Sequence, residues 1–220
     1  MKILGINASP RGSNSQTLRL VEAALNGAKS AGAEVELIDI CRLKISYCNA
    51  CNVCFKTGEC IYNDDFKGLY EKMLASDGMV WGSPNYFHSV TGQMKTMIDR
   101  MADAMHCQLL AGKYCCFVAT GGNNTDQVTE YLSGLFLNFG TFVTGSVGAS
   151  MSGGPKALEG AEKKAFDLGK SLAEDILAKR DYIEQREMQE EIRDYFQKLV
   201  KMHQKDWEHE YEYWNRLNWT

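Results

Sequence analysis

The sequence predicts an α/β fold built on a five-stranded parallel sheet, and two observations lead to this expectation. Short apolar segments alternate five times along the chain with segments whose apolar residues recur every three or four positions. This is the order of strands and helices in a parallel sheet covered on both faces. The strand-like segments, such as residues 79–81 and 115–118, are continuous apolar runs, as burial of both sheet faces requires.

The expected elements follow one another over the first 180 residues. An apolar run at residues 3–6 is followed by a polar turn at 7–15 and a helical pattern at 18–28. The later strands are expected at residues 34–40, 78–81, 114–119 and 141–147, and the later helices at residues 65–74, 93–105, 127–138 and 156–177. The segment between the second strand and its helix is too long for a simple turn, and it contains a group of cysteines.

A helical tail at residues 181–220 is expected to follow a single domain at residues 1–180. The tail has ten acidic and six basic residues, so it carries the whole net charge of the chain, −4. Its apolar residues recur every three or four positions, which predicts one stripe on a helix about 50 Å long. The stripe consists of Ile192, Phe196, Leu199, His203, Trp207, Tyr211 and Trp214. Either the tail's own domain or a neighbouring subunit must cover it, and we favour the subunit.

The composition excludes several classes of protein. A chain of 220 residues, 45% of them hydrophobic, can bury a full core. The mild negative charge and the lack of a lysine or arginine cluster argue against a nucleic-acid partner. No run of about 18 apolar residues and no signal-peptide pattern is present, so we expect a cytoplasmic protein without a membrane partner. Eight cysteines in such a protein are expected to be reduced rather than paired.

The polar loop after the first strand predicts a phosphate site. A helix N-terminus offers free N–H groups and a partial positive charge, to which hydroxyls and an arginine add contacts. The candidate residues are Ser9, Arg11, Ser13, Asn14, Ser15, Gln16 and Thr17. Neither the P-loop pattern nor the glycine pattern of dinucleotide sites is present, so FMN, a monophosphate, fits the switch point of such a sheet. The alternative is that Ser13 or Ser15 only caps the helix.

Two further loops are expected at the same edge of the sheet. The candidate residues are Pro84, Asn85, Tyr86, Phe87 and His88 after the third strand, and Thr120, Gly121 and Gly122 after the fourth. Backbone amides and an aromatic ring of the first loop can bind a flavin ring, and the glycines allow close backbone approach. A plain loop with a buried Phe87 is the alternative. His88 is the candidate proton donor, against the alternative of a packed or solvated histidine.

Four closely spaced cysteines predict a metal centre. Cys48, Cys51, Cys54 and Cys60 lie within thirteen residues, and Gly58 allows the turn that brings in the fourth. This spacing is typical of a [4Fe–4S] cluster, whereas zinc prefers two separated pairs. A zinc site and free or disulfide-forming thiols are the alternatives. The other cysteines are expected to be small core residues: Cys41, Cys107, Cys115 and Cys116.

Three motifs together resemble the NADPH-dependent FMN reductase family of flavodoxin-like proteins: residues 9–17, 82–87 and 93–100. The resemblance implies a flavodoxin-like three-layer sandwich in which the first loop holds the FMN phosphate and the two later loops hold the isoalloxazine. It also implies a homodimer or homotetramer that completes the site. The cysteine loop at residues 46–63 resembles the iron–sulfur flavoprotein branch of this family, in which the cluster lies near FMN across a subunit interface.

These observations predict an FMN-dependent oxidoreductase. NAD(P)H gives up two electrons as hydride whereas a cluster accepts one at a time, so a flavin is needed between them. We expect electrons to pass between NAD(P)H or ferredoxin, FMN and a [4Fe–4S] cluster, with ferredoxin or a quinone as electron partner. One alternative is an NAD(P)H:FMN or quinone reductase without a cluster. The other is a flavodoxin-like electron carrier or redox sensor.

Overall fold

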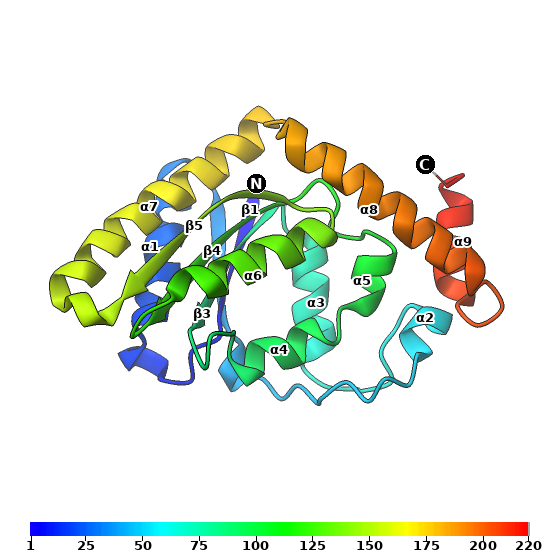
Figure 1. Ribbon diagram of the computed structural model, residues 1–220, viewed down its shortest axis with the longest axis horizontal. Coiled ribbons are helices and arrows are strands. Elements are labelled where there is room, and N and C mark those ends of the chain that lie inside the picture. Colours follow the sequence, from blue (N-terminus) through cyan, green and yellow to red (C-terminus); the bar gives the residue numbers. More distant parts are fainter. Residues whose placement is uncertain (220) are drawn as a thin grey trace.

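The computed structural model describes residues 1–219 and has the expected five-stranded parallel sheet at its centre, in the order β2-β1-β3-β4-β5 (Figure 1). The strands are β1 (Lys2–Asn7), β2 (Glu34–Asp39), β3 (Gly78–Pro84), β4 (Tyr114–Gly121) and β5 (Phe142–Ser150). Every neighbouring pair is parallel. The predicted α/β class is therefore confirmed, with every strand but β2 a few residues longer than expected and β2 one residue shorter.

Helices cover both faces of the sheet and make it the middle of three layers. One face carries α1 (Gln16–Ser30) and α7 (Pro155–Ala178). The other face carries α3 (Phe66–Ala75), α4 (Gly92–Ile98), α5 (Ala102–His106) and α6 (Thr125–Asn138). Two separate hydrophobic cores result, and β3 contributes to both, because Val80 faces the first helix layer while Met79 and Trp81 face the second.

Helices α1 and α7 approach one another so closely that their backbones touch. A methyl group added at Gly169 would lie 1.8 Å from the carbonyl oxygen of Ala24. One added at Gly27 would lie 1.9 Å from the carbonyl oxygen of Phe166. Glycine is therefore required at both positions for a steric reason, since no other side chain fits between these helices.

The prediction of a single helix at residues 93–105 is wrong. It is divided into α4, which ends at Ile98, and α5, which begins at Ala102. At the break the side chain of Arg100 turns inward, where it is buried and donates to the carbonyl oxygen of Ser46 and to Asp64. The ion pair is formed with a residue 36 positions earlier in the chain, so helical periodicity alone did not reveal it.

The tail is two helices rather than one, α8 (Ile183–Met202) and α9 (Glu208–Arg216). The turn between them is closed by the ring of His203, which stacks on Trp207 with 4.4 Å between ring centroids. Figure 1 shows α8 running on from the end of α7 and α9 lying next to the short helix α2 (Val53–Thr57). The expectation of one long helix is therefore wrong.

The tail's aromatic residues pack on their own chain, whereas we expect from the sequence that a neighbouring subunit covers them. Trp207 stacks on His106 of α5, and its ring also contacts Phe55 of α2. Trp214 is buried and donates through Nε1 to the carbonyl oxygen of His106 at 3.0 Å. The stripe is thus covered without a second subunit at these residues.

Helix α8 also covers the start of the free sheet edge at β5. The side-chain amide of Gln185 pairs with both backbone groups of Val143, accepting from its N–H at 2.8 Å and donating to its carbonyl at 3.0 Å. Gln189 donates to the carbonyl of Thr141 at 2.8 Å. Two glutamines thereby supply the hydrogen bonds that another strand would make, which protects an edge that otherwise favours aggregation.

We expect the substitution Gln185→Leu to lower the free energy of unfolding by about 1–2 kcal/mol, because both backbone groups of Val143 lose their partner. Urea-induced unfolding followed by circular dichroism measures this change. The control is Gln204→Leu in the exposed turn before α9, which is expected to change the free energy by less than about 0.5 kcal/mol. Equal losses in the two variants would contradict a role for Gln185 at the sheet edge.

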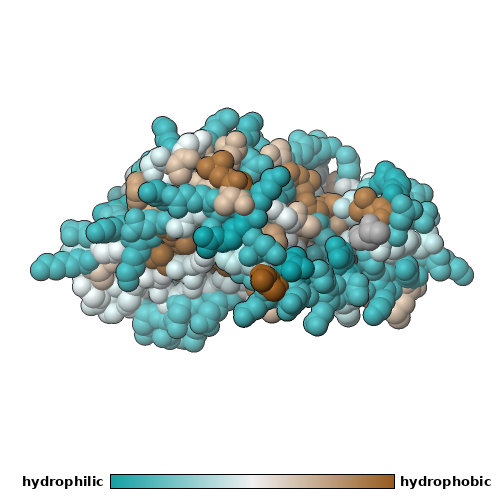
Figure 2. All heavy atoms as spheres, turned by 90° about the horizontal axis from the view of Figure 1, so that it is seen from above, coloured by the Kyte–Doolittle hydropathy of each residue, from teal (hydrophilic) through white to brown (hydrophobic). Residues whose placement is uncertain are grey.

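The surface gives no sign of a membrane-spanning element. Among residues 1–219 no helix is both long and apolar enough to cross a bilayer. Figure 2 shows a face that is mainly hydrophilic, with hydrophobic side chains in small separate groups. Phe87 is the most exposed of the large hydrophobic residues, and its side chain is fully accessible to solvent.

Candidate functional site

The first candidate site is a cavity of about 290 Å³ at the carboxyl ends of β1, β3 and β4. It is lined by Ser9, Arg11, Gln16, Thr17, Pro84, Asn85, Tyr86, Thr120, Gly121, Gly122 and Met151. The hydroxyls of Thr17 and Thr120 are 2.6 Å apart and join the start of α1 to the end of β4. The three predicted loops therefore meet at one point, because parallel strands end at the same edge of the sheet.

The loop after β1 divides into residues that line the cavity and residues that shape the helix start. Ser15 is buried, and its hydroxyl accepts from the N–H of Leu18 at 2.9 Å, so it is the N-cap of α1. Ser13 and Asn14 belong to the short 3-10 helix η1 (Gly12–Asn14), where both are exposed and do not line the cavity. The capping alternative for Ser15 is confirmed.

Asn85 leaves an unsatisfied acceptor at the cavity. Its amide Nδ2 donates to the carbonyl oxygens of Asn123 and Asn124 at 2.9 and 3.2 Å. Its Oδ1 is buried and has no hydrogen-bond partner. Buried polar atoms are nearly always paired in folded proteins, so an unpaired one needs an explanation such as a missing ligand. A methyl group at Gly121 would lie 2.8 Å from the Asn85 Cβ, so this wall tolerates only glycine.

Phe87 and His88 stand outside the cavity, at the tip of a tight turn. Tyr86 and Ser89 exchange two backbone hydrogen bonds of 3.0 and 3.1 Å, and the two residues between them have φ values of 52° and 64°. Such left-handed conformations are costly for bulky residues and are commonest at functional sites. The Nδ1 of His88 lies 2.8 Å from Gln127 Oε1 on α6. The alternative of a plain loop with a buried Phe87 is therefore wrong.

Met151 is a cavity residue that the sequence reasoning missed. It begins the 3-10 helix η3 (Met151–Gly153) directly after β5. The available signal was a strand followed by a glycine-rich turn at residues 152–155, because such a turn after a parallel strand lies at the same edge of the sheet. The flavin-binding role of the predicted residues stays a prediction. Five of them do not line the cavity: Ser13, Asn14, Ser15, Phe87 and His88.

The second candidate site is the cysteine loop between β2 and α3. Cys48 and Cys51 are exposed, Cys54 and Cys60 are partly buried, and all four are free thiols. Ala50 and Asn52, between these cysteines, have left-handed φ values of 55° and 60°. Within residues 1–219 no group of three or more His, Cys, Asp or Glu side chains is arranged to hold a metal ion. The structure therefore does not bring the four predicted ligands together.

Two of the four thiols nevertheless share a cavity of about 170 Å³. Cys54 and Cys60 line it together with Gly58, Glu59, Tyr62, Phe66, Lys67, Tyr70, Glu71, Leu74, Arg100 and Asp103. Burial and the nearby carboxylates of Asp103 and Glu210 raise the pKa of Cys54 to about 12. This thiol is accordingly protonated at neutral pH, and a positively charged metal centre is what would favour its thiolate form.

Arg100 is the buried cation of this cavity. Its Nη1 donates to the carbonyl oxygen of Ser46 at 2.9 Å, and its two Nη groups form a paired contact with Asp64 at 3.0 and 3.2 Å. Its guanidinium also lies over the rings of Tyr62 and Phe66. Burial alone raises the pKa of Asp64, but hydrogen bonds from Arg100 and two backbone N–H groups lower it to about 2. Asp64 is therefore ionised at neutral pH.

Helix α9 covers the cysteine loop from the outside. The carboxylate of Glu210, which is fully buried, lies 3.1 Å from Nδ1 of His106. The imidazole of His209 lies against Gly58, where an added methyl group would come within 2.5 Å of the ring. The short helix α2, which carries Cys54, is thus held between the tail and α5.

The buried Asp103 gives the protein a pH dependence. Burial raises the pKa of Asp103 to about 6, even though Tyr70 donates to it at 3.0 Å. The folded state therefore binds this proton more tightly than the unfolded state. The resulting stability is fully present below the ordinary pKa near 4 and is lost as the pH rises through 6.

We expect Asp103→Asn to be more stable than the unaltered protein at pH 7, by up to about 3 kcal/mol. The amide removes the cost of a buried charge while it keeps an acceptor for Tyr70. The free energy of unfolding in urea, measured at pH 5, 6 and 7, should decline less with rising pH in the variant than in the unaltered protein. A parallel decline in both proteins would contradict the assignment of this titration to Asp103.

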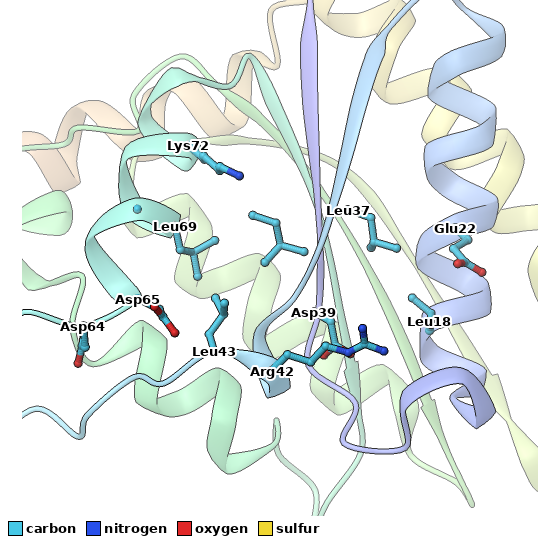
Figure 3. A pocket seen from close by; sticks show the side chains of 12 residues that line it. Leu18, Glu22, Leu37, Asp39, Arg42, Leu43, Asp64, Asp65, Leu69 and Lys72 are labelled. Carbon is cyan, nitrogen blue, oxygen red and sulfur yellow. The ribbon is translucent and has the colours of Figure 1, made fainter.

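The two candidate sites lie far apart in one chain, and a larger cavity belongs to neither. Figure 1 shows α2 at the opposite side of the molecule from the start of α1. A groove of about 780 Å³ runs along the edge strand β2, between α1 and α3 (Figure 3). Its arginine and lysine, Arg42 and Lys72, are already paired with Asp39 and Glu36, and it has no unpaired buried group.

Comparison with known proteins gives a consistent result. The sequence model of NADPH-dependent FMN reductases matches residues 1–156. An iron–sulfur flavoprotein of Archaeoglobus fulgidus is 33% identical over 217 residues, which covers 97% of each chain. An iron–sulfur flavoprotein of Methanocaldococcus jannaschii is 40% identical over 126 residues, 56% of this chain and 63% of the relative. An NAD(P)H-dependent FAD/FMN reductase of Geobacillus thermodenitrificans is 32% identical over 56% of this chain and 60% of its own length.

Solved structures show the same fold. A flavone reductase superposes with a TM-score of 0.65 at 26% identity, covering 80% of this chain and 63% of that one. An FMN-dependent NADH-azoreductase of Bacillus anthracis, solved in complex with FMN, has a TM-score of 0.61 at 16% identity. It covers 79% of this chain and 100% of its own. At that identity the azoreductase supports only the similarity of fold.

Proposed function

This chain belongs to the NADPH-dependent FMN reductase family, within the branch of iron–sulfur flavoproteins, and from this membership we propose that it passes electrons between NAD(P)H, FMN and a [4Fe–4S] cluster. Family membership makes it an FMN-containing oxidoreductase. The single observation that carries the proposal is the convergence of the polar loop after β1 and two later strand-end loops on one cavity with an unpaired acceptor.

The chemical groups that line the cavity are suited to bind FMN. The N-terminus of α1 offers free N–H groups, and Arg11 adds a cation at the cavity, so together they favour a bound phosphate. Oδ1 of Asn85 is suited to accept from an N–H of the flavin ring, while Gly121 lets the backbone approach it. When bound, FMN supplies the exchange of two electrons as hydride or of one electron at a time. Tyr86 borders the cavity.

The cysteine loop fits an iron–sulfur cluster through its donors. It carries four free thiols within thirteen residues, and the backbone N–H of Ala50 already donates to the sulfur of Cys48 at 3.4 Å. Thiolates on one loop at this spacing are the ligands that such clusters use. We infer that Cys48, Cys51, Cys54 and Cys60 are brought together when the cluster is assembled.

The separation of the two sites favours an oligomer. The cavity at the sheet edge and the cavity at the cysteine loop share no lining residue, so one chain does not juxtapose the two cofactors. We infer that a homodimer or homotetramer places the cysteine loop of one subunit near the flavin cavity of another. Ferredoxin or a quinone in the cytoplasm completes the electron path in this proposal.

The test is an anaerobic purification followed by visible spectroscopy, flavin analysis and iron analysis. We expect about one FMN and about four irons per chain, and bleaching of the flavin absorbance on addition of NADPH or NADH. Colourless protein that takes up no FMN on reconstitution would overturn the proposal. If the protein holds both groups but oxidises neither NADPH nor NADH, the proposed reductase activity is wrong.

Two pairs of variants separate the sites. Arg11→Ala should weaken FMN binding about tenfold, the equivalent of one charge-assisted contact, with Arg19→Ala, on the exposed side of α1, as its control. Cys54→Ser should lose most of the iron while it keeps FMN, with the half-buried Cys41→Ser as its control. Iron content that is unchanged in Cys54→Ser would contradict the cluster assignment.

A further inference from the structure

Arg100 has a hydrogen-bond donor that the protein's own oxygens leave unused. The Nη groups of the guanidinium donate hydrogen bonds to Ser46 and Asp64. Its Nε is buried and has no hydrogen-bond partner. The side chain is only 1% exposed, so water does not take the place of the missing acceptor. An unpaired donor at this depth is costly unless the functional state of the protein supplies an acceptor.

One candidate acceptor in the same cavity is a predicted cluster ligand. Arg100 and Cys60 line the same cavity, and Cys60 is among the groups that raise the pKa of Arg100. A thiolate is a far better acceptor than a thiol, and it attracts a cation. Arg100 is also held rigidly by Asp64 and by the rings of Tyr62 and Phe66, so its position is fixed before any cluster is present.

We propose that Arg100 sets the reduction potential of the cluster, with its Nε–H bonded to the sulfur of Cys60 and its charge stabilising the reduced cluster. This inference rests on the proposed function. Uptake of one electron makes the cluster one unit more negative, and hydrogen bonds to ligand sulfur together with nearby charge are established controls of cluster potentials. A buried cation acts strongly because little solvent screens it. Arg100 is thus a positioning residue that acts through Cys60.

Asp64 opposes this effect and makes the inference testable in both directions. Its carboxylate neutralises much of the Arg100 charge at a distance of 3.0 Å. Removing the cation should make the cluster harder to reduce, whereas removing the carboxylate should make it easier to reduce. A merely structural role for this ion pair predicts the same change in both variants, because each breaks the same contact.

The experiment is an anaerobic redox titration of the holoprotein, in which electron paramagnetic resonance follows the reduced cluster. Iron content is measured first, and absence of iron from the unaltered protein counts against the proposed function rather than against Arg100. With the cluster present, we expect a shift to lower potential in Arg100→Gln and to higher potential in Asp64→Asn. Arg100→Lys, which keeps the charge but lacks Nε–H, should lie between Arg100→Gln and the unaltered protein.

The control is Lys67→Gln, which removes a cation that lines the same cavity but is mostly exposed and paired with Glu59. Solvent screening should make its shift clearly smaller than that of Arg100→Gln. Equal shifts in Lys67→Gln and Arg100→Gln, or shifts of the same sign in Arg100→Gln and Asp64→Asn, would overturn the inference. If Arg100→Gln fails to hold iron, Asp64→Asn decides alone, and an unchanged or lower potential there overturns it.

Discussion

Alanine at position 169 is expected to destabilise the protein by about 3 kcal/mol or more. The added methyl group would overlap the carbonyl oxygen of Ala24 at 1.8 Å, so α1 and α7 must move apart. Overpacking of a tight contact costs about 1–3 kcal/mol and sometimes more, and here the obstacle is backbone rather than a movable side chain. The midpoint of urea-induced unfolding, followed by circular dichroism, measures the loss.

A matched control exists in the same helix. Gly160 also lies in α7, but nothing is found within 4 Å of a methyl group added there. Gly160→Ala should therefore raise the free energy of unfolding by about 0.4–1 kcal/mol, because alanine restricts the unfolded chain more than glycine does. The same substitution should thus have opposite signs at two positions of one helix. Stabilisation by Gly169→Ala would show that the helices do not touch as described.

The second large effect is expected in the tail. Trp214→Ala should lower the free energy of unfolding by about 3 kcal/mol or more, as for other buried tryptophans. The indole is only 2% exposed and its Nε1 donates to the carbonyl of His106, so its loss leaves a cavity and an unpaired backbone group. Because α9 covers α2, we also expect faster tryptic cleavage in the tail and the cysteine loop.

Trp219→Ala is the control for this prediction. Trp219 lies near the end of the chain and contacts Tyr211 and Lys201, and it is less buried than Trp214. We expect its loss to cost less than about 1 kcal/mol and to leave the cleavage rate of the cysteine loop unchanged. Comparable losses in the two variants would indicate that α9 is held by general hydrophobic contact rather than by Trp214.

The sheet and the flavin cavity could be predicted from the sequence because their signals are local. Continuous apolar runs such as residues 115–118 identify buried strands, and parallel strands necessarily end at one edge. The polar loop containing Ser9, Arg11 and Thr17 follows directly on β1. Topology alone then brings it to Thr120 and Gly121 at the end of β4.

What could not be predicted depends on contacts between distant residues. The break in the chain at Arg100 is accompanied by contacts with Ser46 and Asp64, and the break near His203 by stacking of Trp207 on His106 of α5. Neither break is marked by glycine or proline within the helical pattern. A buried Phe87 was the alternative to a flavin-binding role because phenylalanine is usually buried, yet a tight turn carries it into solvent.

The unequal ends of the sheet limit how copies of this chain can associate by adding strands. Gln185 and Gln189 occupy backbone groups of Val143 and Thr141 at the start of β5, whereas the groove of Figure 3 runs along β2. Two copies that met through β2 would pair identical surfaces across a two-fold axis. Further association through β5 would then have to avoid the residues that α8 covers, so the tail restricts how a larger assembly can form by adding strands.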